Sequence, residues 1–172
     1  MKNNTLPEAW LRGPIPGIPP LLQPAAHALK QANEDVERYT TDFPEALLWD
    51  RPAGRASVGF HLQHLTGVLD RMPTYAKDQP LSEEQFTYLR AEGKAGVKTT
   101  VQQLVQNFDD KVKEASEYFE TLADGELTQF RTVGRKELPS TVIGLLFHAA
   151  EHSQRHVGQL LVTASVVKQE QG

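Results

Sequence analysis

Apolar residues recur every three or four positions in four long stretches of the chain, which is the spacing of an amphipathic helix. These predicted helices span residues 21–39, 57–76, 94–123 and 139–167. Ser57 fits the N-cap position of the second stretch, and Pro139 fits the first turn of the fourth. A shorter helix is predicted over residues 82–89, where Ser82 and Gln85 have the spacing of a capping box.

The segments between these helices are rich in turn-forming residues. Six of the eleven prolines lie between Pro7 and Pro24, which predicts an extended N-terminal segment. We expect it to pack against the rest of the chain through the apolar side chains of Trp10, Leu11, Ile15 and Ile18. Residues 127–138 combine glycine, threonine and a short alternation of polarity, so a loop or a small hairpin is predicted there. Residues 1–20 are therefore assigned to an extended N-terminal segment and residues 21–168 to a single domain.

The last long stretch carries very little charge. Between Pro139 and Val167 only Glu151 and Arg155 are formally charged, against nine charged residues between Lys94 and Ala123. A helix with so few charges is expected to be largely surrounded by the other helices. The predicted fold is therefore all-α, a four-helix bundle with a proline-rich N-terminal extension.

Composition excludes several classes of function. The 172 residues have a formal net charge of −4 and include no cysteine. Disulfides, thiolate-held metal sites and a cysteine nucleophile are thus excluded, and the missing basic excess argues against a nucleic-acid partner. No apolar stretch approaches the length of a membrane span, and the N-terminus lacks the basic and apolar regions of a signal peptide. We expect a cytoplasmic protein that does not bind membranes.

Five of the six histidines fall into two clusters, one in the second predicted helix and one in the last. His148, His152 and His156 follow one another at four-residue steps, so they form a ladder on the core side of their helix. The second helix offers His61 inside its apolar stripe and His64 on the flank of that stripe, which by itself favours His61 as a ligand. Buried imidazoles need partners, and a metal ion satisfies several of them together. The clusters therefore predict a metal site.

Two known kinds of metal site fit the sequence poorly. The stretch from His148 to His152 matches the H-x-x-E-H pattern of inverzincin proteases. That site needs a further carboxylate well downstream, and Glu170 is the sole acidic residue after His152. The di-iron bundle site requires Glu-x-x-His pairs, and the sequence contains none. Both readings are therefore disfavoured.

The two histidine clusters resemble the signatures of the DinB-like family, four-helix metal-dependent proteins named after DNA-damage-inducible proteins. The family's second helix opens with a Trp-Ser-Ile-like start that leads to a His-Leu pair, matched by residues 57–65. Its last helix carries His-x-x-x-His followed by Gly-Gln, matched from His152 to Gln159. The resemblance extends over roughly residues 20–167. Ala56 stands where many relatives have tryptophan, so Trp49 or Trp10 is expected to supply that aromatic packing.

Carried over by position, the resemblance implies a metal ion held by His64, His152 and His156. His61 and His148, one helical turn before the expected ligands, are then interpreted as contacts of those ligands or of the substrate. Zinc is the expected ion, with nickel and iron as alternatives. Gly158 is interpreted as permitting close packing between helices.

Three neutral ligands leave an open position on a divalent ion, which is typical of a catalytic site. The first functional hypothesis is a metal-dependent enzyme, a small-thiol-dependent S-transferase or a hydrolase, with a small-molecule substrate. The S-transferase reading follows from the resemblance, because characterised relatives use low-molecular-weight thiols. Glu151, Arg155 and Gln159 would orient the substrate or a ligand. The alternative is a non-catalytic, metal-binding stress-response bundle that acts through dimerisation, and a homodimer is expected in either case.

Overall fold

The computed structural model describes residues 6–96 and 99–170, and these residues are mostly helical. Five α-helices and one antiparallel pair of short strands are present in this part of the chain. The elements are α1 (Gln23–Thr40), α2 (Val58–Ala76), α3 (Glu83–Ala91), α4 (Val101–Glu120), β1 (Phe130–Val133), β2 (Leu138–Thr141) and α5 (Val142–Gln169). The expected helical architecture is confirmed, whereas a purely all-α description omits the small sheet.

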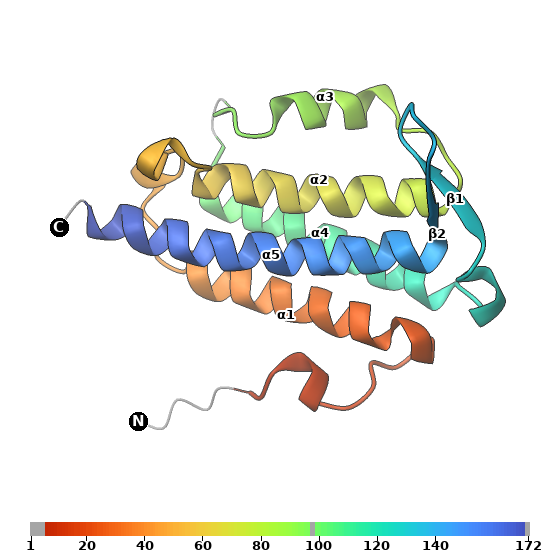
Figure 1. The fold of residues 1–172 in the computed structure, drawn as a ribbon. Coiled ribbons are helices and arrows are strands. Elements are labelled where there is room, and N and C mark those ends of the chain that lie inside the picture. Colours follow the sequence, from red (N-terminus) through yellow and green to blue (C-terminus); the bar gives the residue numbers. More distant parts are fainter. Residues whose placement is uncertain (1–5, 97–98, 171–172) are drawn as a thin grey trace.

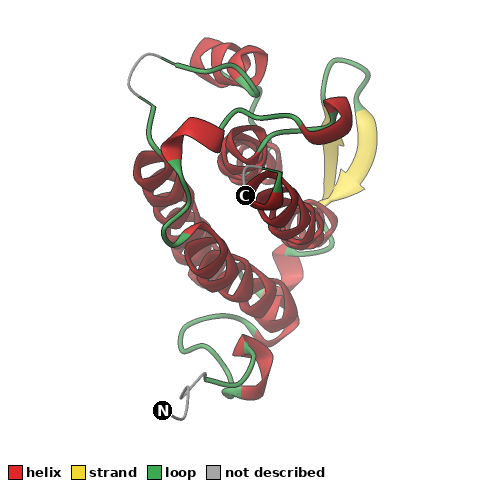
Figure 2. Cartoon of the chain, turned by 90° about the vertical axis from the view of Figure 1, so that its left-hand side faces the viewer, coloured by secondary structure: helices red, strands yellow, loops and turns green. Residues whose placement is uncertain are grey.

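The four long helices pack side by side around one apolar core (Figure 1). α5 contacts α1 and α2, and α4 contacts the same two helices. Figure 2 shows α3 outside this arrangement, and α3 packs against α2. The largest side chains of the core are almost fully buried, among them Leu29, Leu62, Phe108, Leu145 and Leu160. None of the described helices combines the length and apolar character needed to cross a lipid bilayer.

The predicted caps of α2 and α3 are present. The Ser57 hydroxyl accepts a hydrogen bond from the backbone N–H of Phe60, which starts α2 at Val58. Ser82 and Gln85 form the reciprocal bonds of a capping box at the start of α3. Because each cap satisfies a backbone donor that the helix cannot, the starts of these helices follow from the local sequence.

Two long helices begin later than predicted. α4 starts at Val101, where the Thr100 hydroxyl accepts from the backbone of Gln103, rather than at Lys94. Val97 and Lys98, within the predicted helix, lie outside the described residues. α5 starts at Val142, because Pro139 lies in β2 opposite Thr132 instead of opening the helix. A two-stranded sheet tolerates this proline, since each of its strands has a free edge.

The N-terminal segment is held mainly by polar contacts to α1. The backbone N–H of Ala9 donates to Gln31 Oε1, and Arg12 forms a two-pronged ion pair with Glu34 at 2.6 and 2.7 Å. Ala9 and Ile18 are buried, and Ile15 packs against the core. The expectation that Trp10 and Leu11 anchor the segment was wrong, because they are 62% and 56% exposed. Residues 1–5 lie outside the described part of the chain.

Candidate metal centre

The histidines of α2 and α5 meet where these two helices pack together. The start of α2 is fixed by the Ser57 cap and by Trp49, whose ring occupies the space beside Gly59 where a side chain would lie. Trp49 thus supplies aromatic packing at the first turn of α2, whereas Trp10 is exposed. Gly59 N–H also donates to the carbonyl of Leu48, which ties the preceding loop to the helix.

Three imidazoles converge between the helices. His64, His152 and His156 each offer one ring nitrogen, and these atoms all lie within 4.8 Å of one another. Nε2 of His64 is 2.9 Å from Nε2 of His152. Two nitrogens bound to one tetrahedral zinc ion are about 3.3 Å apart, given Zn–N bonds of about 2.0–2.1 Å. The spacing of the donor atoms therefore fits a shared divalent ion.

The orientation of His64 is set by a buried carboxylate from outside the bundle. Nδ1 of His64 lies 2.6 Å from Oε2 of Glu92, and Oε1 of Glu92 accepts from Arg71 Nη1 at 2.7 Å. The side chains of Glu92 and Arg71 are only 5% and 8% exposed. Because the carboxylate accepts the Nδ1 proton, Nε2 is left with its lone pair directed at His152. This is the carboxylate–histidine arrangement that commonly supports metal ligands.

A glycine makes room for this ion pair. A Cβ atom added at Gly67 would overlap the Glu92 carboxylate and the Arg71 guanidinium. Gly67 lies on α2 between His64 and Arg71, so all three belong to one stretch of the same helix. The close approach of Glu92 to α2 thus depends on the absence of a side chain at this position.

His61 supports a different ligand. Nδ1 of His61 is 3.0 Å from Nδ1 of His156, and when His156 donates this hydrogen bond, its Nε2 keeps the lone pair that a metal ion needs. Burial, with a contribution from nearby His64, lowers the pKa of His61 to about 4. Burial and the neighbouring histidines lower the pKa of His156 to about 3. Both rings are therefore neutral near pH 7, which is the form required for ligation and for this hydrogen bond.

His152 has a buried nitrogen without a partner. Its Nδ1 is shielded from solvent and makes no hydrogen bond to any described residue. Nε2 of His152 faces the lone pair of His64 Nε2. The His152 ring can therefore make one hydrogen bond among the described residues, by donating its Nε2 proton to His64. A buried polar atom left in this state costs about 1–3 kcal/mol. Together with His64 and His156, His152 could hold a divalent ion.

The remaining predicted residues lie on the outer side of α5. His148 is exposed, and its Nδ1 is 2.9 Å from Oε1 of Glu151. Oε2 of Glu151 accepts from Arg155 at 2.8 Å, so the Glu151 carboxylate bridges His148 and Arg155. His148, Glu151 and His152 form a second group whose donor atoms lie within 4.8 Å of one another. The structure therefore brings His148 next to His152, but away from the ring of His64.

Arg155 and Gln159 line a pocket that reaches the histidine cluster. Its volume is about 620 Å³, and His61 forms part of its wall. The other lining residues are Arg55, Ala56, Gly158, Val162 and Thr163. Gly158 has open space where a side chain would lie, so the interpretation that it permits close helix packing was wrong. Glu151 does not line this pocket.

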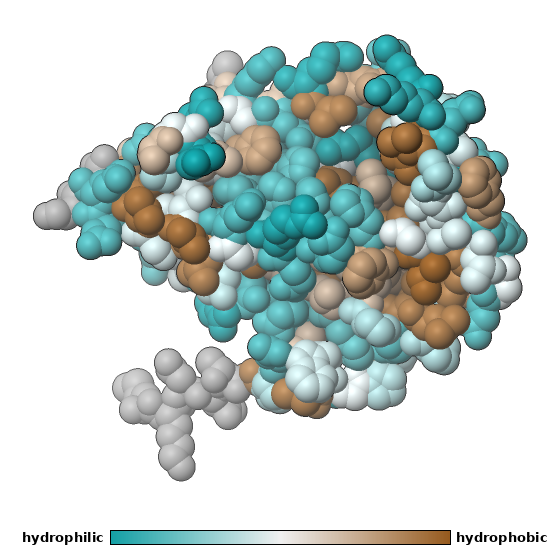
Figure 3. Space-filling view, in the orientation of Figure 1, coloured by the Kyte–Doolittle hydropathy of each residue, from teal (hydrophilic) through white to brown (hydrophobic). Residues whose placement is uncertain are grey.

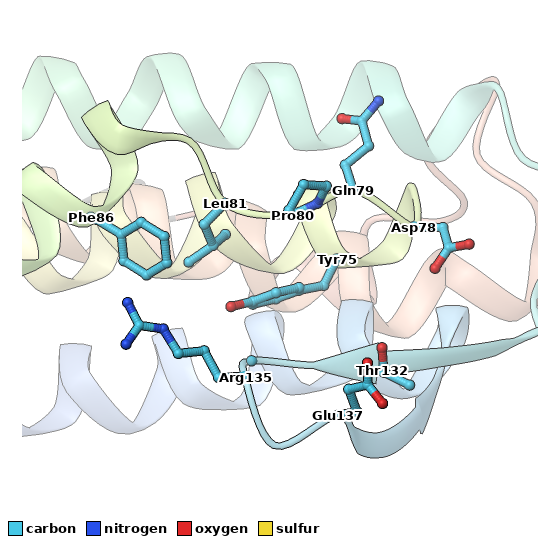
Figure 4. Close-up of a pocket in the computed structure, with 10 residues that line it drawn as sticks. Tyr75, Asp78, Gln79, Pro80, Leu81, Phe86, Thr132, Arg135 and Glu137 are labelled. Atoms are coloured by element: carbon cyan, nitrogen blue, oxygen red, sulfur yellow. The ribbon is translucent and has the colours of Figure 1, made fainter.

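A second pocket lies at the opposite end of α2, between the loop before α3 and the hairpin (Figure 4). Its walls include Tyr75, Phe86 and Arg135, and its volume is about 390 Å³. Tyr75 is eleven residues after His64 on α2, which corresponds to about 16 Å along the helix. No histidine lines this pocket, so it is separate from the candidate metal centre.

Sequence reasoning missed Glu92, Arg71 and Gly67. Glu92 follows α3 and belongs to no apolar pattern, so nothing in its surroundings marks it. Arg71 carried a weak signal, because a charged residue seven positions after His64 lies on nearly the same face of the helix. Its 6% exposure, unusual for arginine, shows that this face is covered.

Comparisons with known proteins agree with this fold. No curated protein gives a significant match. Among solved structures, a conserved protein from Enterococcus faecalis superposes with a TM-score of 0.68. The match covers 86% of this chain and 97% of that one at 19% sequence identity, so it supports the fold alone. A family model described as the DinB superfamily matches residues 28–160. This range includes all five clustered histidines, and the chain belongs to the DinB superfamily.

Proposed function

We propose that this protein is a divalent-metal-dependent enzyme, a small-thiol S-transferase or a hydrolase, whose ion is held by His64, His152 and His156. The observation that carries the proposal is the convergence of one ring nitrogen from each of these three side chains within 4.8 Å. The DinB superfamily is known for metal binding, which supports the same conclusion.

The surroundings of the three histidines favour a catalytic site over a purely structural one. Three neutral nitrogen ligands leave at least one position of a tetrahedral ion open. A zinc ion held in this way supplies a Lewis acid that makes water or a thiol available as a nucleophile near neutral pH. Zinc is the proposed ion, with nickel and iron as alternatives, because imidazole suits all three.

The chain's own residues divide into three roles in this proposal. Glu92 accepts the Nδ1 proton of His64, and His61 would accept the Nδ1 proton of His156, so both ligands would present Nε2. Arg155 and Gln159 line the adjacent pocket and would orient a substrate. Glu151 contacts Arg155 through the ion pair described above and would orient it towards a substrate.

Elemental analysis tests the metal site. Purification without a nickel column, followed by mass spectrometry, should find one divalent ion per chain in the unaltered protein. His152→Ala and His156→Ala should each abolish it. His27→Ala is the matched control, since His27 contacts the Gly13 carbonyl away from the cluster. Unchanged metal content in the first two variants would show that the ligands are assigned wrongly.

Turnover measurements on metal-loaded protein test the activity. The enzyme should conjugate a low-molecular-weight thiol to a model electrophile or hydrolyse an ester, and His152→Ala should not. Full metal occupancy without turnover, across a panel of thiols and esters, would favour the non-catalytic alternative.

A second candidate, the non-catalytic bundle that acts as a homodimer, is supported by the outer face of α5. Phe147, Leu161 and Val162 are 60%, 38% and 62% exposed. Figure 3 shows hydrophobic side chains towards both ends of this helix, with hydrophilic ones between them. Light scattering on the unaltered protein and on Phe147→Ser tests this candidate, which requires a dimer that the substitution weakens.

A further inference from the structure

The pocket beside the histidine cluster differs in charge from the other pockets of the described surface. Two arginines, Arg55 and Arg155, line it, and none of its lining residues is acidic. The four other pockets described each include at least two carboxylates among their lining residues. The net charge of the chain is −4, whereas the charged side chains that line this pocket are both positive.

Both arginines can reach a ligand. Arg55 is exposed, and its side chain makes no hydrogen bond or ion pair with the described residues. Arg155 is 56% exposed, and its single ion pair is the one with Glu151, four residues earlier on α5. Exposed ion pairs of this spacing are weak, so a bound anion can compete with Glu151 for the guanidinium. Planar guanidinium groups pair well with carboxylates, which they bind through two parallel hydrogen bonds.

The rest of the wall suits a small organic molecule. Ala56, Val162 and Thr163 present methyl groups, Gln159 adds an amide, and Gly158 leaves the surface open. The volume of about 620 Å³ is in the range of ligand-binding pockets. His61, which contacts His156 at 3.0 Å, places one side of the pocket against the candidate metal centre.

We propose that this pocket binds a small molecule that carries a carboxylate. Arg55 and Arg155 would bind the carboxylate, and the apolar wall of the pocket would contact the carbon skeleton of the molecule. The inference rests on the proposed function for the reaction that such a molecule undergoes. It narrows the substrate class of that function to anionic compounds.

A matched pair of probes tests the charge requirement. 3-Phenylpropionate and 3-phenylpropionamide have nearly the same shape and apolar surface, and they differ in the charged group. Their dissociation constants would be measured by nuclear magnetic resonance titration of metal-free and metal-loaded protein. We expect the carboxylate to bind about tenfold more tightly than the amide in both forms, with shifts at the amides of Gly158 and Val162. Equal binding of the two probes would overturn the proposal.

Substitutions locate the recognition residues. Arg55→Gln and Arg155→Gln should each weaken binding of 3-phenylpropionate about threefold or more, and the double variant should remove the preference over the amide. Arg90→Gln removes the same charge from α3, where Arg90 contacts Thr87 and does not line the pocket. Equal losses of affinity in Arg90→Gln and in the pocket variants would show that binding depends only on the net charge of the protein. That result would refute the assignment of Arg55 and Arg155.

The metal-free measurement separates this proposal from the proposed function. A carboxylate preference in protein that binds no metal would support the pocket and contradict the metalloenzyme. Normal metal binding without a carboxylate preference would support the metal centre and overturn the pocket.

Discussion

Nδ1 of His64 lies 2.6 Å from a carboxylate oxygen of Glu92, although the two residues are 28 positions apart and Glu92 comes from the end of α3. The contact is buried and is backed by Arg71, which pairs with the second oxygen of the same carboxylate. α3, which lies outside the four long helices, therefore contributes directly to the candidate metal centre.

Glu92→Gln should weaken metal binding by about 10- to 100-fold, because the neutral amide no longer fixes the Nδ1 proton of His64 by a charged hydrogen bond. Competition with a coloured chelator measures the affinity. Glu83→Gln, on the exposed first turn of α3, is the control and should bind metal normally. An unchanged affinity in Glu92→Gln would mean that the carboxylate does not support the ligand.

Gly67→Ala should leave the protein less stable than Gly158→Ala does, since the added methyl group overlaps the buried Glu92–Arg71 pair and displaces it. Metal affinity should fall with it, because Glu92 can no longer approach His64. Gly158→Ala is the matched control in α5, where the added methyl group meets open space. It should raise the free energy of unfolding by about 0.5–1 kcal/mol through helix propensity. Urea denaturation of the two variants compares them, and equal effects would contradict the packing argument.

His64→Ala and His61→Ala should differ in metal affinity by at least about tenfold, with the larger loss in His64→Ala. His64 belongs to the group of three converging donors, whereas His61 acts through Nδ1 of His156. Isothermal titration with zinc measures both variants. Equal losses of zinc affinity would mean that His61 and His64 contribute equally to metal binding, which would contradict the assignment of His64 as the ligand.

The metal-free protein should lose stability as the pH falls from about 6.5 to about 4. Burial lowers the pKa of His61 to about 4 and that of His156 to about 3, below the ordinary value of 6.5. The unfolded chain therefore binds more protons than the folded chain in this interval, and the free energy of unfolding decreases on acidification. The stabilisation is fully present above pH 6.5.

Urea denaturation at pH 7.5, 5.5 and 4.5 measures this loss, which is expected to be on the order of 1–3 kcal/mol for His61. His61→Asn removes one of the two groups, so its stability should depend less on pH over the same interval. A variant with the same pH dependence as the unaltered protein would show that other groups cause the acid sensitivity.

Much of the fold follows from local sequence. The Ser57 cap, the capping box of Ser82 and Gln85, and the apolar spacing define α2 and α3, because these signals act within one or two helical turns. The ladder of His148, His152 and His156 was likewise predictable, since residues four apart on a helix share a face. The start of α5 was not predictable in this way. Pro139 is compatible with the first turn of a helix and with a strand at a sheet edge. It lies in β2 because that strand pairs with β1, where Thr132 is its partner.

The sequence by itself determined which two helices carry the histidines and that the chemistry does not involve cysteine. The apolar pattern favoured His61 and the family resemblance implied His64; the tertiary structure places His64 in the converging group. Only the tertiary structure revealed Glu92 and Arg71 as support for His64. The physical reason is the range of the interactions. Helix periodicity and capping are encoded over a few residues, whereas the donor spacing depends on how α2, α3 and α5 pack across the bundle.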